Sequence, residues 1–364
     1  MRKVRAAVVT EFGKPLEMQN FEVPKLREGQ VLVRITASGV CGSDVHIWKG
    51  LDPRVKTPLI LGHEGIGVVE NLAGEKSDVF GNVLNVGDNI IWDRGVVCGV
   101  CHYCVIHKTP SLCVNRWTYG ISKTCAEPPY LNGCYSEAMV LDEKTKIIKL
   151  DKQIDPVTLV SASCSGATSA HSFDLHPLKT GETVLVQGPG PIGVFHVAFA
   201  KEQGASEIIV IGGTEKRLAL CRKFGATTTI NRHETTLQER KEIIRELTGG
   251  RGVDVAYECS GTVQAFMEGL QHIRVGGAYL VPGFGVPSGE AKIDCYHLIT
   301  RKNVKIQGVW VSDTEHLYRA VKLVLSGKYP FRELVTHKLP LTEATEALQL
   351  VEERKALKVV LVPD

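Results

Sequence analysis

The sequence contains no run of about 18 apolar residues, so we expect no transmembrane helix. It also contains no stripe of Lys and Arg, because its 43 basic residues are scattered among 40 acidic ones and the net charge is only +3. Such a chain attracts neither nucleic acid nor anionic lipid strongly, so we predict neither partner. Internal repeats and low-complexity tracts are lacking too, which argues against a repeat protein or a disordered one.

The opening segment MRKVRAAVVTEFGK places basic residues before an apolar run, but Glu11 interrupts that run after a few residues. A signal peptide needs a longer run, so we expect a β-strand here and a cytoplasmic protein. The eleven cysteines are an odd number. In such a chain this number argues against a disulfide framework and for thiolates as metal ligands.

The length of 364 residues exceeds the size of a single hydrophobic core, so we expect two domains. Up to about residue 160 the chain shows short β-type runs between Gly, Pro and Asn signals. From Glu182 strands alternate with amphipathic helices, as in ETVLVQG and PIGVFHVAFAKEQG, which indicates parallel βαβ units. Two helical runs follow Asp313, and a last strand, LKVVLVPD, is expected to return to the first region.

Four cysteines occur in CGVCHYCVIHKTPSLC: Cys98, Cys101, Cys104 and Cys113. Four thiolates this close can surround one ion tetrahedrally, and the metal replaces the core that such a loop cannot build. The spacing favours a structural zinc site, with an iron–sulfur cluster as the alternative. Cys125 and Cys134 lie near enough to compete with Cys113 as the fourth ligand, although we expect them to be buried thiols.

A second group begins in GVCGSDVHIWKG and continues in LILGHEGIGVVE. Cys41, His63 and Glu64 together offer a thiolate, an imidazole and a carboxylate, the mixture found where zinc keeps one position open for substrate. Considered separately, Cys41 would be interpreted as a small buried hydrophobic residue and His63 as a loop histidine.

A glycine motif, GPGPIG, lies between a strand and a helix. Its first glycine makes the tight turn, the second lets the backbone approach a pyrophosphate, and the third lets the helix pack on the strand. The motif predicts a dinucleotide site formed by Gly188, Gly190, Pro191, Ile192 and Gly193.

The motifs GVCGSDVH, GHEGIG, the four-cysteine segment, CSGAT, GPGPIG and ALKVVLV occur in this order over nearly the whole chain. In this the sequence resembles the zinc-dependent alcohol dehydrogenases of the medium-chain dehydrogenase/reductase family. The resemblance implies an α/β protein with a GroES-like β-barrel catalytic domain and a Rossmann domain with a doubly wound parallel sheet. We expect the first at residues 1–164 and 305–364, with a structural zinc lobe at about 95–115, and the second at 165–304.

The resemblance also assigns the metal ligands. It implies a catalytic zinc ion on Cys41, His63 and Cys164, with Glu64 behind the metal as a transient ligand. Polyol and threonine dehydrogenases of the family tend to have glutamate in place of Cys164, so this chain is closer to the simple alcohol dehydrogenases there. Asp44 would orient the histidine ligand.

The remaining roles concern the proton and the cofactor. The resemblance gives Ser43 and His46 the proton relay, by which a zinc-bound alcohol loses its proton before hydride passes to the nicotinamide. Thr168 would pack against the nicotinamide ring, and Lys358 would meet the pyrophosphate.

The cofactor preference follows from EIIVIGGTEKRL, where Gly212 stands at the end of the second strand. NAD-selective folds place a carboxylate there, about 20 residues after the glycines. Its absence leaves room for a 2′-phosphate, to which Gly213, Thr214, Lys216 and Arg217 offer space, a hydroxyl and positive charge. We therefore predict NADP(H) over NAD(H); the alternative is that Glu215 rescues NAD binding.

The predicted activity is a zinc-dependent dehydrogenase that interconverts an alcohol and an aldehyde or ketone. The alternatives are an NAD-dependent polyol or hydroxy-amino-acid dehydrogenase, and a regulatory module that binds zinc and a nucleotide without catalysis. The zinc-free quinone and enoyl reductases of the superfamily are disfavoured by the ligand set. By analogy we expect a homotetramer or homodimer, in which VKIQGVWVSD provides an edge strand. The sequence does not specify the particular alcohol.

Overall fold

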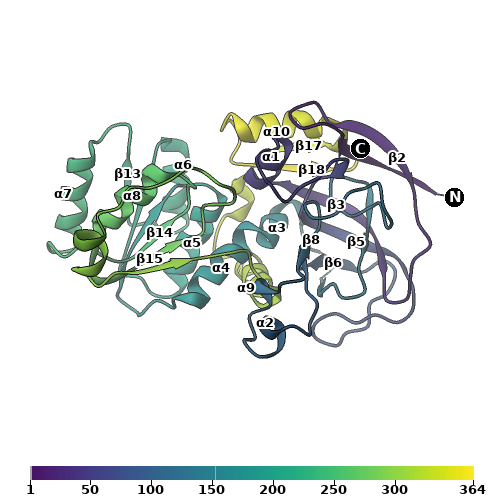
Figure 1. Cartoon of the computed structure of the whole chain (residues 1–364), viewed down its shortest axis with the longest axis horizontal. Coiled ribbons are helices and arrows are strands. Elements are labelled where there is room, and N and C mark those ends of the chain that lie inside the picture. Colours follow the sequence, from purple (N-terminus) through teal and green to yellow (C-terminus); the bar gives the residue numbers. More distant parts are fainter. Residues whose placement is uncertain (1, 152) are drawn as a thin grey trace. The chain divides into compact units, whose positions relative to one another are not determined.

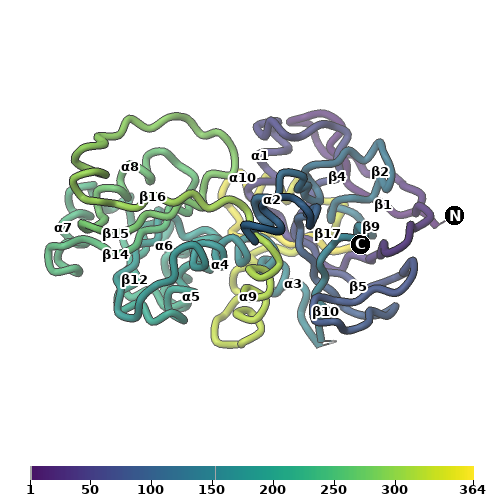
Figure 2. Tube along the Cα trace, turned by 60° about the horizontal axis from the view of Figure 1, so that its bottom comes forward, coloured from purple at the N-terminus to yellow at the C-terminus, as the bar shows by residue number. Residues whose placement is uncertain are grey.

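The computed structural model describes residues 2–151 and 153–364, and the chain divides into two compact units. Unit 1 comprises Met1–Cys164, Ser312–Leu325 and Phe331–Asp364, and unit 2 comprises Ser165–Val311 and Ser326–Pro330. Both ends of the chain therefore belong to unit 1. Figure 1 labels the elements of both units, and Figure 2 follows the chain through them.

Unit 1 is rich in short strands, as the turn signals predicted. Its strands are β1 (Lys3–Val9), β2 (Glu17–Glu22), β3 (Val31–Val40), β4 (Leu59–Ile60), β5 (Glu64–Leu72), β6 (Asn89–Trp92), β7 (Gly95–Val96), β8 (Trp117–Thr118), β9 (Ala138–Leu141), β10 (Ile147–Leu150), β17 (Val335–Pro340) and β18 (Lys358–Val362). Its α-helices are α1 (Gly42–Trp48), α2 (His102–Val105), α3 (Pro156–Leu159), α9 (Thr314–Leu325) and α10 (Ala344–Glu352).

The strands of unit 1 form a seven-stranded sheet in the order β10-β6-β5-β3-β18-β17, in which β9 also pairs with β3. A three-stranded sheet has the order β2-β1-β4, and an isolated bridge joins Ala6 of β1 to Ser136, two residues before β9. The last strand, β18, pairs antiparallel with β3, with Val359 opposite Val40. The expected return of the tail to the first region is therefore confirmed.

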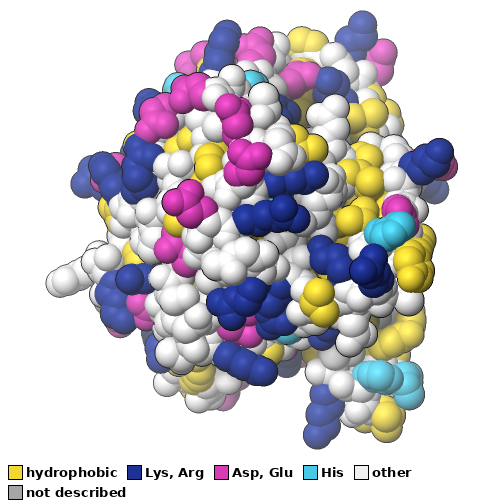
Figure 3. All heavy atoms as spheres, turned by 90° about the vertical axis from the view of Figure 1, so that its left-hand side faces the viewer, with side chains coloured by type: hydrophobic (Ala, Val, Ile, Leu, Met, Phe, Trp, Pro, Cys, Tyr) yellow, Lys and Arg dark blue, Asp and Glu magenta, His cyan; other side chains and the backbone are white. Residues whose placement is uncertain are grey.

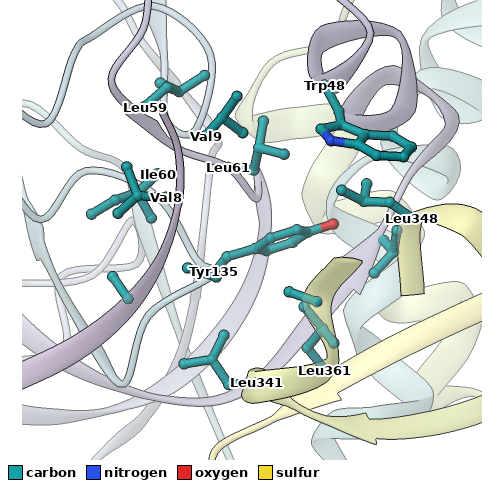
Figure 4. Close-up of a cluster of buried hydrophobic side chains, with 14 of the residues drawn as sticks. Val8, Val9, Trp48, Leu59, Ile60, Leu61, Tyr135, Leu341, Leu348 and Leu361 are labelled. Carbon is teal, nitrogen blue, oxygen red and sulfur yellow. The ribbon is translucent and has the colours of Figure 1, made fainter. Parts of the chain in front are cut away.

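A hydrophobic cluster holds the helices of unit 1 against its sheets. Figure 4 shows Trp48 of α1 facing Leu348 of α10, with Leu361 of β18 and Tyr135 in the same cluster. Trp48 is further fixed because its indole N–H donates to the Lys14 carbonyl at 2.6 Å. Burial of each of these large side chains stabilises the folded state by about 2 kcal/mol. This packing fixes α1, which begins directly after the candidate ligand Cys41.

Unit 2 contains a six-stranded sheet in the order β13-β12-β11-β14-β15-β16, and every pairing in it is parallel. Its strands are β11 (Thr183–Gln187), β12 (Glu207–Gly212), β13 (Thr228–Asn231), β14 (Val253–Glu258), β15 (Ile273–Val281) and β16 (Lys305–Gly308). Its α-helices are α4 (Ser165–Leu175), α5 (Pro191–Glu202), α6 (Glu215–Lys223), α7 (Leu237–Leu247) and α8 (Val263–His272). A π-helical turn covers Tyr296–Thr300.

Both faces of this sheet are covered, because every residue of β11 is buried. Successive side chains of a strand point to opposite faces. Leu185 packs in one cluster with Ile244 of α7 and Leu270 of α8. The helix α5 packs instead with α4 and α6. The parallel, doubly wound α/β sheet predicted from the alternation of strands and helices is thus confirmed.

One domain boundary differs from our expectation. We placed the return to the first domain at residue 305, but β16 pairs with β15 and belongs to unit 2, and the chain re-enters unit 1 at Ser312. The strand pattern of VKIQGVW identifies a strand without specifying which sheet it joins. Residues Ser326–Pro330 also belong to unit 2, where Tyr329 stacks on Phe224.

The surface carries charges of both signs. On the face drawn in Figure 3, basic side chains are interspersed with acidic ones. Within residues 2–151 and 153–364, no helix combines the length and the apolar character needed to cross a bilayer.

Candidate functional site

The first part of the site is the turn from β3 into α1. Cys41 precedes the helix, and its backbone N–H donates to Asp44 Oδ2 at 2.9 Å, so the carboxylate caps the helix start. Asp44 is fully buried. The hydroxyl of Tyr135 donates to the same Oδ2 at 3.3 Å. Asp44 is therefore fixed from two sides.

The other oxygen of Asp44 holds His63, which directly precedes β5. His63 Nδ1 lies 3.1 Å from Asp44 Oδ1, and both side chains are buried. Burial alone lowers the pKa of His63, but Asp44 raises it, to about 10. Because Nδ1 is engaged with the carboxylate, Nε2 is the nitrogen available to a ligand. The structure therefore places Asp44 as we expected, next to the imidazole.

Cys164 reaches the same place from a distant part of the sequence, at the junction between a 3-10 turn (Val160–Ser163) and α4. Its Sγ lies 3.9 Å from Cys41 Sγ. The hydrogen bond from Cys41 lowers the pKa of Cys164, and the positive charge of Arg94 lowers it further. One ligand atom each from Cys41, His63, Glu64 and Cys164 lies within 4.8 Å of the others. We call these four residues the thiolate–imidazole cluster.

Glu64, the carboxylate of this cluster, is paired with a lysine. Lys358 Nζ donates to Glu64 Oε1 at 2.9 Å and to Oε2 at 2.7 Å, and both residues are almost fully buried. The pair needs Gly39, because a Cβ there would lie 2.1 Å from Glu64 Oε2. Lys358 Nζ also donates to the Val40 carbonyl at 3.3 Å.

The position of Lys358 corrects one expectation. We expected this lysine to meet the cofactor pyrophosphate, but its three N–H donors already have three acceptors inside unit 1. Burial alone lowers the pKa of Lys358, but Glu64 raises it, so the ammonium stays charged. Its position supports a role in neutralising Glu64.

The expected relay residues lie on α1. Ser43 Oγ is 3.8 Å from Cys41 Sγ, beside the thiolate–imidazole cluster. His46 is one turn further along the helix, and its Nδ1 is buried without a hydrogen-bond partner in the described chain. Burial lowers the pKa of His46 from 6.5. Thr168, the residue expected against the nicotinamide, is buried in the first turn of α4.

The four-cysteine segment forms a second cluster, around α2. Cys113 Sγ lies 3.5 Å from Cys98 Sγ, and Cys101 Sγ lies 3.6 Å from Cys104 Sγ. All four sulfurs lie within 4.8 Å of one another. A backbone N–H from Val100 lowers the pKa of Cys98 to about 6, which favours the thiolate. We call this group the four-cysteine cluster.

The two competing cysteines lie elsewhere. Cys125 is buried in the same hydrophobic cluster as Trp48, and Cys134 is buried in a separate hydrophobic cluster with its Sγ 3.6 Å from Met139 Sδ. Cys113 directly follows a short 3-10 turn (Pro110–Leu112).

The glycine motif of unit 2 has the geometry that its spacing predicts. Gly188 has a φ of +105°, which a side chain would strain. A Cβ at Gly193 would lie 2.0 Å from the Gly188 carbonyl oxygen, whereas one at Gly190 would meet nothing within 4 Å. Gly190 therefore leaves an open approach to the start of α5, where Pro191 is the first helical residue. Ile192 follows it and accepts a hydrogen bond from Ser169 through its carbonyl.

Two basic residues that our sequence analysis missed, Arg232 and His233, lie beside the end of β12. Gly212 ends the strand and Thr214 precedes α6, as expected. A Cβ at Gly213 would lie 2.6 Å from His233 Nε2 and 2.9 Å from Arg232 Nε. These residues follow β13, the parallel neighbour of β12, and that pairing was the signal that could have identified them.

The acidic residue in this region is engaged elsewhere. Glu215, which we considered as a partner for an NAD ribose, forms an ion pair with Arg222 on the same helix. Lys216 and Arg217 occupy the first turn of α6 beside it.

Comparisons with known proteins place this geometry in a family. Residues 27–152 match the model of the alcohol dehydrogenase GroES-like domain, and residues 191–326 match the model of a zinc-binding dehydrogenase. The 5-exo-hydroxycamphor dehydrogenase of Pseudomonas putida is 34% identical, and the alignment covers 99% of each chain. The chain belongs to the zinc-dependent medium-chain dehydrogenases.

Other members of this family are similar over the same length. The L-threonine 3-dehydrogenase of Bacillus subtilis is 30% identical over 94% of this chain and 93% of its own. The crystal structure of an alcohol dehydrogenase from Thermotoga maritima is 44% identical, covers 100% of both chains and superposes with a TM-score of 0.97.

Membership of the zinc-dependent medium-chain dehydrogenases confirms the family and the fold class expected from the motifs, with a GroES-like domain and a Rossmann domain. The protein is an oxidoreductase of this family, with zinc, a nicotinamide cofactor and a small-molecule substrate.

Proposed function

We propose that this dehydrogenase interconverts an alcohol and an aldehyde or ketone with NADP(H), on a zinc ion held by Cys41, His63 and Cys164. The observation that carries the proposal is the convergence of these ligand atoms, with Glu64, to within 4.8 Å of one another. Two thiolates and an imidazole are a ligand set that suits zinc and leaves a fourth position for substrate. When bound, zinc would act as a Lewis acid that lowers the pKa of the substrate hydroxyl.

The surrounding residues prepare this ligand set. Asp44 fixes the orientation and tautomer of His63 through Nδ1, which leaves Nε2 directed to the metal. Lys358 compensates the charge of Glu64, so that the buried carboxylate does not add an uncompensated negative charge to two thiolates. The core around Trp48 keeps α1, and therefore Cys41, in place.

Ser43 and His46 would move the substrate proton. Ser43 Oγ, beside Cys41 Sγ, would accept the hydroxyl proton and pass its own proton on toward His46. Because the pKa of His46 is lowered by burial, its ring is neutral near pH 7 and can accept a proton at Nδ1. Thr168 would pack against the nicotinamide.

We propose NADP(H) as the cofactor because the end of β12 offers positive charge and no carboxylate. Gly190 and Gly193 admit the pyrophosphate to the start of α5. Arg232 and His233 lie against Gly213, and Thr214 with Lys216 and Arg217 follow directly. A 2′-phosphate would find charge-assisted donors here.

Michaelis constants for both cofactors test this preference. We expect a lower constant for NADP⁺ than for NAD⁺, and we expect Arg232→Ala to raise the NADP⁺ constant about tenfold while leaving that for NAD⁺ unchanged. A clear preference of the wild type for NAD⁺ would contradict the assignment.

We propose a second, structural zinc ion on Cys98, Cys101, Cys104 and Cys113. Four thiolates form a closed tetrahedral site without a place for substrate. Elemental analysis of the purified protein should find two zinc ions per chain, and removal of one by a chelator should abolish alcohol oxidation. One zinc ion and no turnover over a panel of primary, secondary and polyhydroxy alcohols would instead support a regulatory module.

A second candidate is a dehydrogenase for polyols or hydroxy amino acids with NAD. Several similar chains, that of Bacillus subtilis among them, are named L-threonine 3-dehydrogenase. The same alcohol panel, with threonine added, distinguishes the two candidates.

We also propose a homotetramer, or otherwise a homodimer, formed through unit 2. The strand β16 lies at the edge of the parallel sheet, and Ile306 on this strand and Trp310 just after it are exposed. Gel filtration should show an oligomer; elution as a monomer would reject the proposal.

A further inference from the structure

Two neighbouring arginines of unit 1 have not yet been assigned a role toward the substrate, and one of them, Arg94, follows β6, which pairs antiparallel with β5 just after His63. Arg94 follows β6 and is only 5% exposed. Burial alone lowers its pKa, but Cys164, Cys41 and Asp93 raise it. This response places the guanidinium charge within electrostatic reach of the two candidate zinc ligands. Arg94 Nη2 donates to Ser312 Oγ at 3.5 Å, a contact between Arg94 and the segment before α9.

Arg116 lies against the backbone of the residue after Arg94. A Cβ at Gly95 would fall 2.0 Å from Arg116 Nη2 and 2.5 Å from its Nε, so the guanidinium needs a glycine there. Arg116 Nη1 donates to Thr118 Oγ1 at 2.7 Å. Its Nε and Nη2 atoms are buried and have no hydrogen-bond acceptor in the part of the chain that the structure describes.

The nearest carboxylate does not satisfy these donors. Asp93 Oδ1 accepts from the Gly95 backbone at 2.9 Å, and Asp93 Oδ2 accepts from Thr314 Oγ1 at 3.0 Å. Burial lowers the pKa of Arg116 to about 10, against the attraction of Asp93, so the desolvation of the guanidinium is only partly compensated. A buried donor without an acceptor destabilises a fold, so these two donors need an acceptor that the described chain does not supply.

The geometry of the unsatisfied donors indicates what they bind. Nε–H and one Nη–H of an arginine point in the same direction and form a two-toothed fork, which matches the paired oxygens of a carboxylate or a phosphate. A neutral hydroxyl would satisfy only one of them. Arg54 also lowers the pKa of Arg116; it is paired with Asp52 and lines a cavity of about 400 Å³ together with Lys56, Lys123 and Glu127.

We propose that the substrate alcohol carries an anionic group, a carboxylate or a phosphate, and that the Nε and Nη2 of Arg116 bind this group beside Arg94. This inference rests on the proposed alcohol oxidation, since it names the class of alcohol that the same site accepts. The substrate would then be a hydroxy acid or a phosphorylated polyol, with its reacting hydroxyl toward Cys41 and Cys164.

The test compares three compounds with the same carbon chain: sorbitol, gluconate and sorbitol 6-phosphate. With the zinc-loaded enzyme and NADP⁺, kcat/KM for at least one anionic compound should exceed that for sorbitol about tenfold or more. The compound that is preferred decides between carboxylate and phosphate. Arg116→Gln should lower kcat/KM for that compound about tenfold to a hundredfold, mainly through KM, and leave sorbitol unchanged.

Two further variants separate binding from folding. Arg116→Lys keeps the charge without the fork and should recover part of the lost kcat/KM. Arg34→Gln removes an exposed arginine from β3 in the same unit and should behave as wild type. Equal use of sorbitol and the anionic compounds, unchanged in Arg116→Gln, would overturn the inference and leave the alcohol dehydrogenase function intact.

Calorimetric titration of gluconate and sorbitol 6-phosphate distinguishes the remaining outcomes. Binding to the wild type that is lost in Arg116→Gln, without turnover of any alcohol, would support the anion site and contradict the proposed function. Neither binding nor preferential turnover of either anion would overturn the inference.

Discussion

The thiolate–imidazole cluster and the four-cysteine cluster use similar ligands but are built in opposite ways. The four-cysteine cluster comes from sixteen consecutive residues, Cys98 to Cys113, on a loop whose local hydrogen bonds hold the sulfurs together. In the other cluster, Cys41 and Cys164 are 123 positions apart in the sequence and meet only through the fold. One cluster depends on its own spacing, and the other depends on the whole of unit 1.

The two clusters also differ in what surrounds them. Behind the thiolate–imidazole cluster lie two buried charged groups, Asp44 on His63 and Lys358 on Glu64. Around the four-cysteine cluster the neighbours are backbone N–H groups, and Val100 and Val114 are exposed. The difference supports our proposal that the first cluster orients a reactive metal, whereas the second holds a metal that stabilises a loop.

The largest expected effect separates the two clusters directly. Cys164→Ser should reduce kcat/KM about a thousandfold or more, because it removes a ligand of the Lewis acid while the fold stays intact. Cys104→Ser should lower the melting temperature but leave kcat/KM of the folded fraction close to wild type. The two variants form a matched pair, and both are examined by steady-state kinetics and thermal unfolding. Similar losses of activity in the two variants would show that the clusters do not differ in this way.

The next effect concerns the buried ion pair behind the first cluster. Lys358→Met should lower the free energy of unfolding by about 3–5 kcal/mol, because it leaves Glu64 buried without a partner. The double variant Glu64→Gln/Lys358→Met should recover most of this loss. Urea unfolding of the single and double variants measures both. Additive losses in the double variant would mean that the pair is not coupled.

A smaller effect is expected at the residue that orients the histidine. Asp44→Asn should weaken zinc binding at the thiolate–imidazole cluster by about tenfold to a hundredfold, as removal of such a partner does in other zinc sites. Competition with a chelator measures this affinity, and zinc at the four-cysteine cluster serves as the internal control. Equal weakening at both sites would indicate a general loss of structure.

The smallest effect is a change in pH dependence. Because burial lowers the pKa of His46 from 6.5 and Asp52 opposes this only in part, the ring is neutral at neutral pH. Oxidation by the wild type should therefore be sustained near pH 7 and decline only in more acidic solution than the ordinary histidine pKa of 6.5 would give, where the ring becomes protonated. His46→Gln should lower kcat about tenfold and abolish this decline. An unchanged acid limb in the variant would assign it to another group.

The sequence predicted most of the local features. The spacing of Cys98, Cys101, Cys104 and Cys113 indicated a cluster before any fold was known, and the strand–glycine–helix pattern located Gly188 and Gly193. Both follow from backbone geometry within a few residues. The helix α7 was missed, although Thr236 and Glu239 form a capping box that signals its start.

Features that depend on long-range packing could not be predicted from the sequence patterns alone. The contact between Cys164 and Cys41 was predicted only from the family resemblance, because no local sequence pattern distinguishes Cys164 from a core cysteine. The pairing of Lys358 with Glu64 replaced the pyrophosphate contact that we expected, because the register of β18 on β3 directs the lysine inward. Arg94 and Arg116 belong to no recognised sequence motif. Only the fold shows that Arg116 lies against the backbone of Gly95, the residue after Arg94.

Anomalous diffraction at the zinc absorption edge, from crystals of the purified protein, tests the central claim most directly. The account predicts two peaks per chain, one among Cys41, His63 and Cys164 and one among the four cysteines of the other cluster. A peak at the four-cysteine cluster alone, with zinc present in excess, would contradict it.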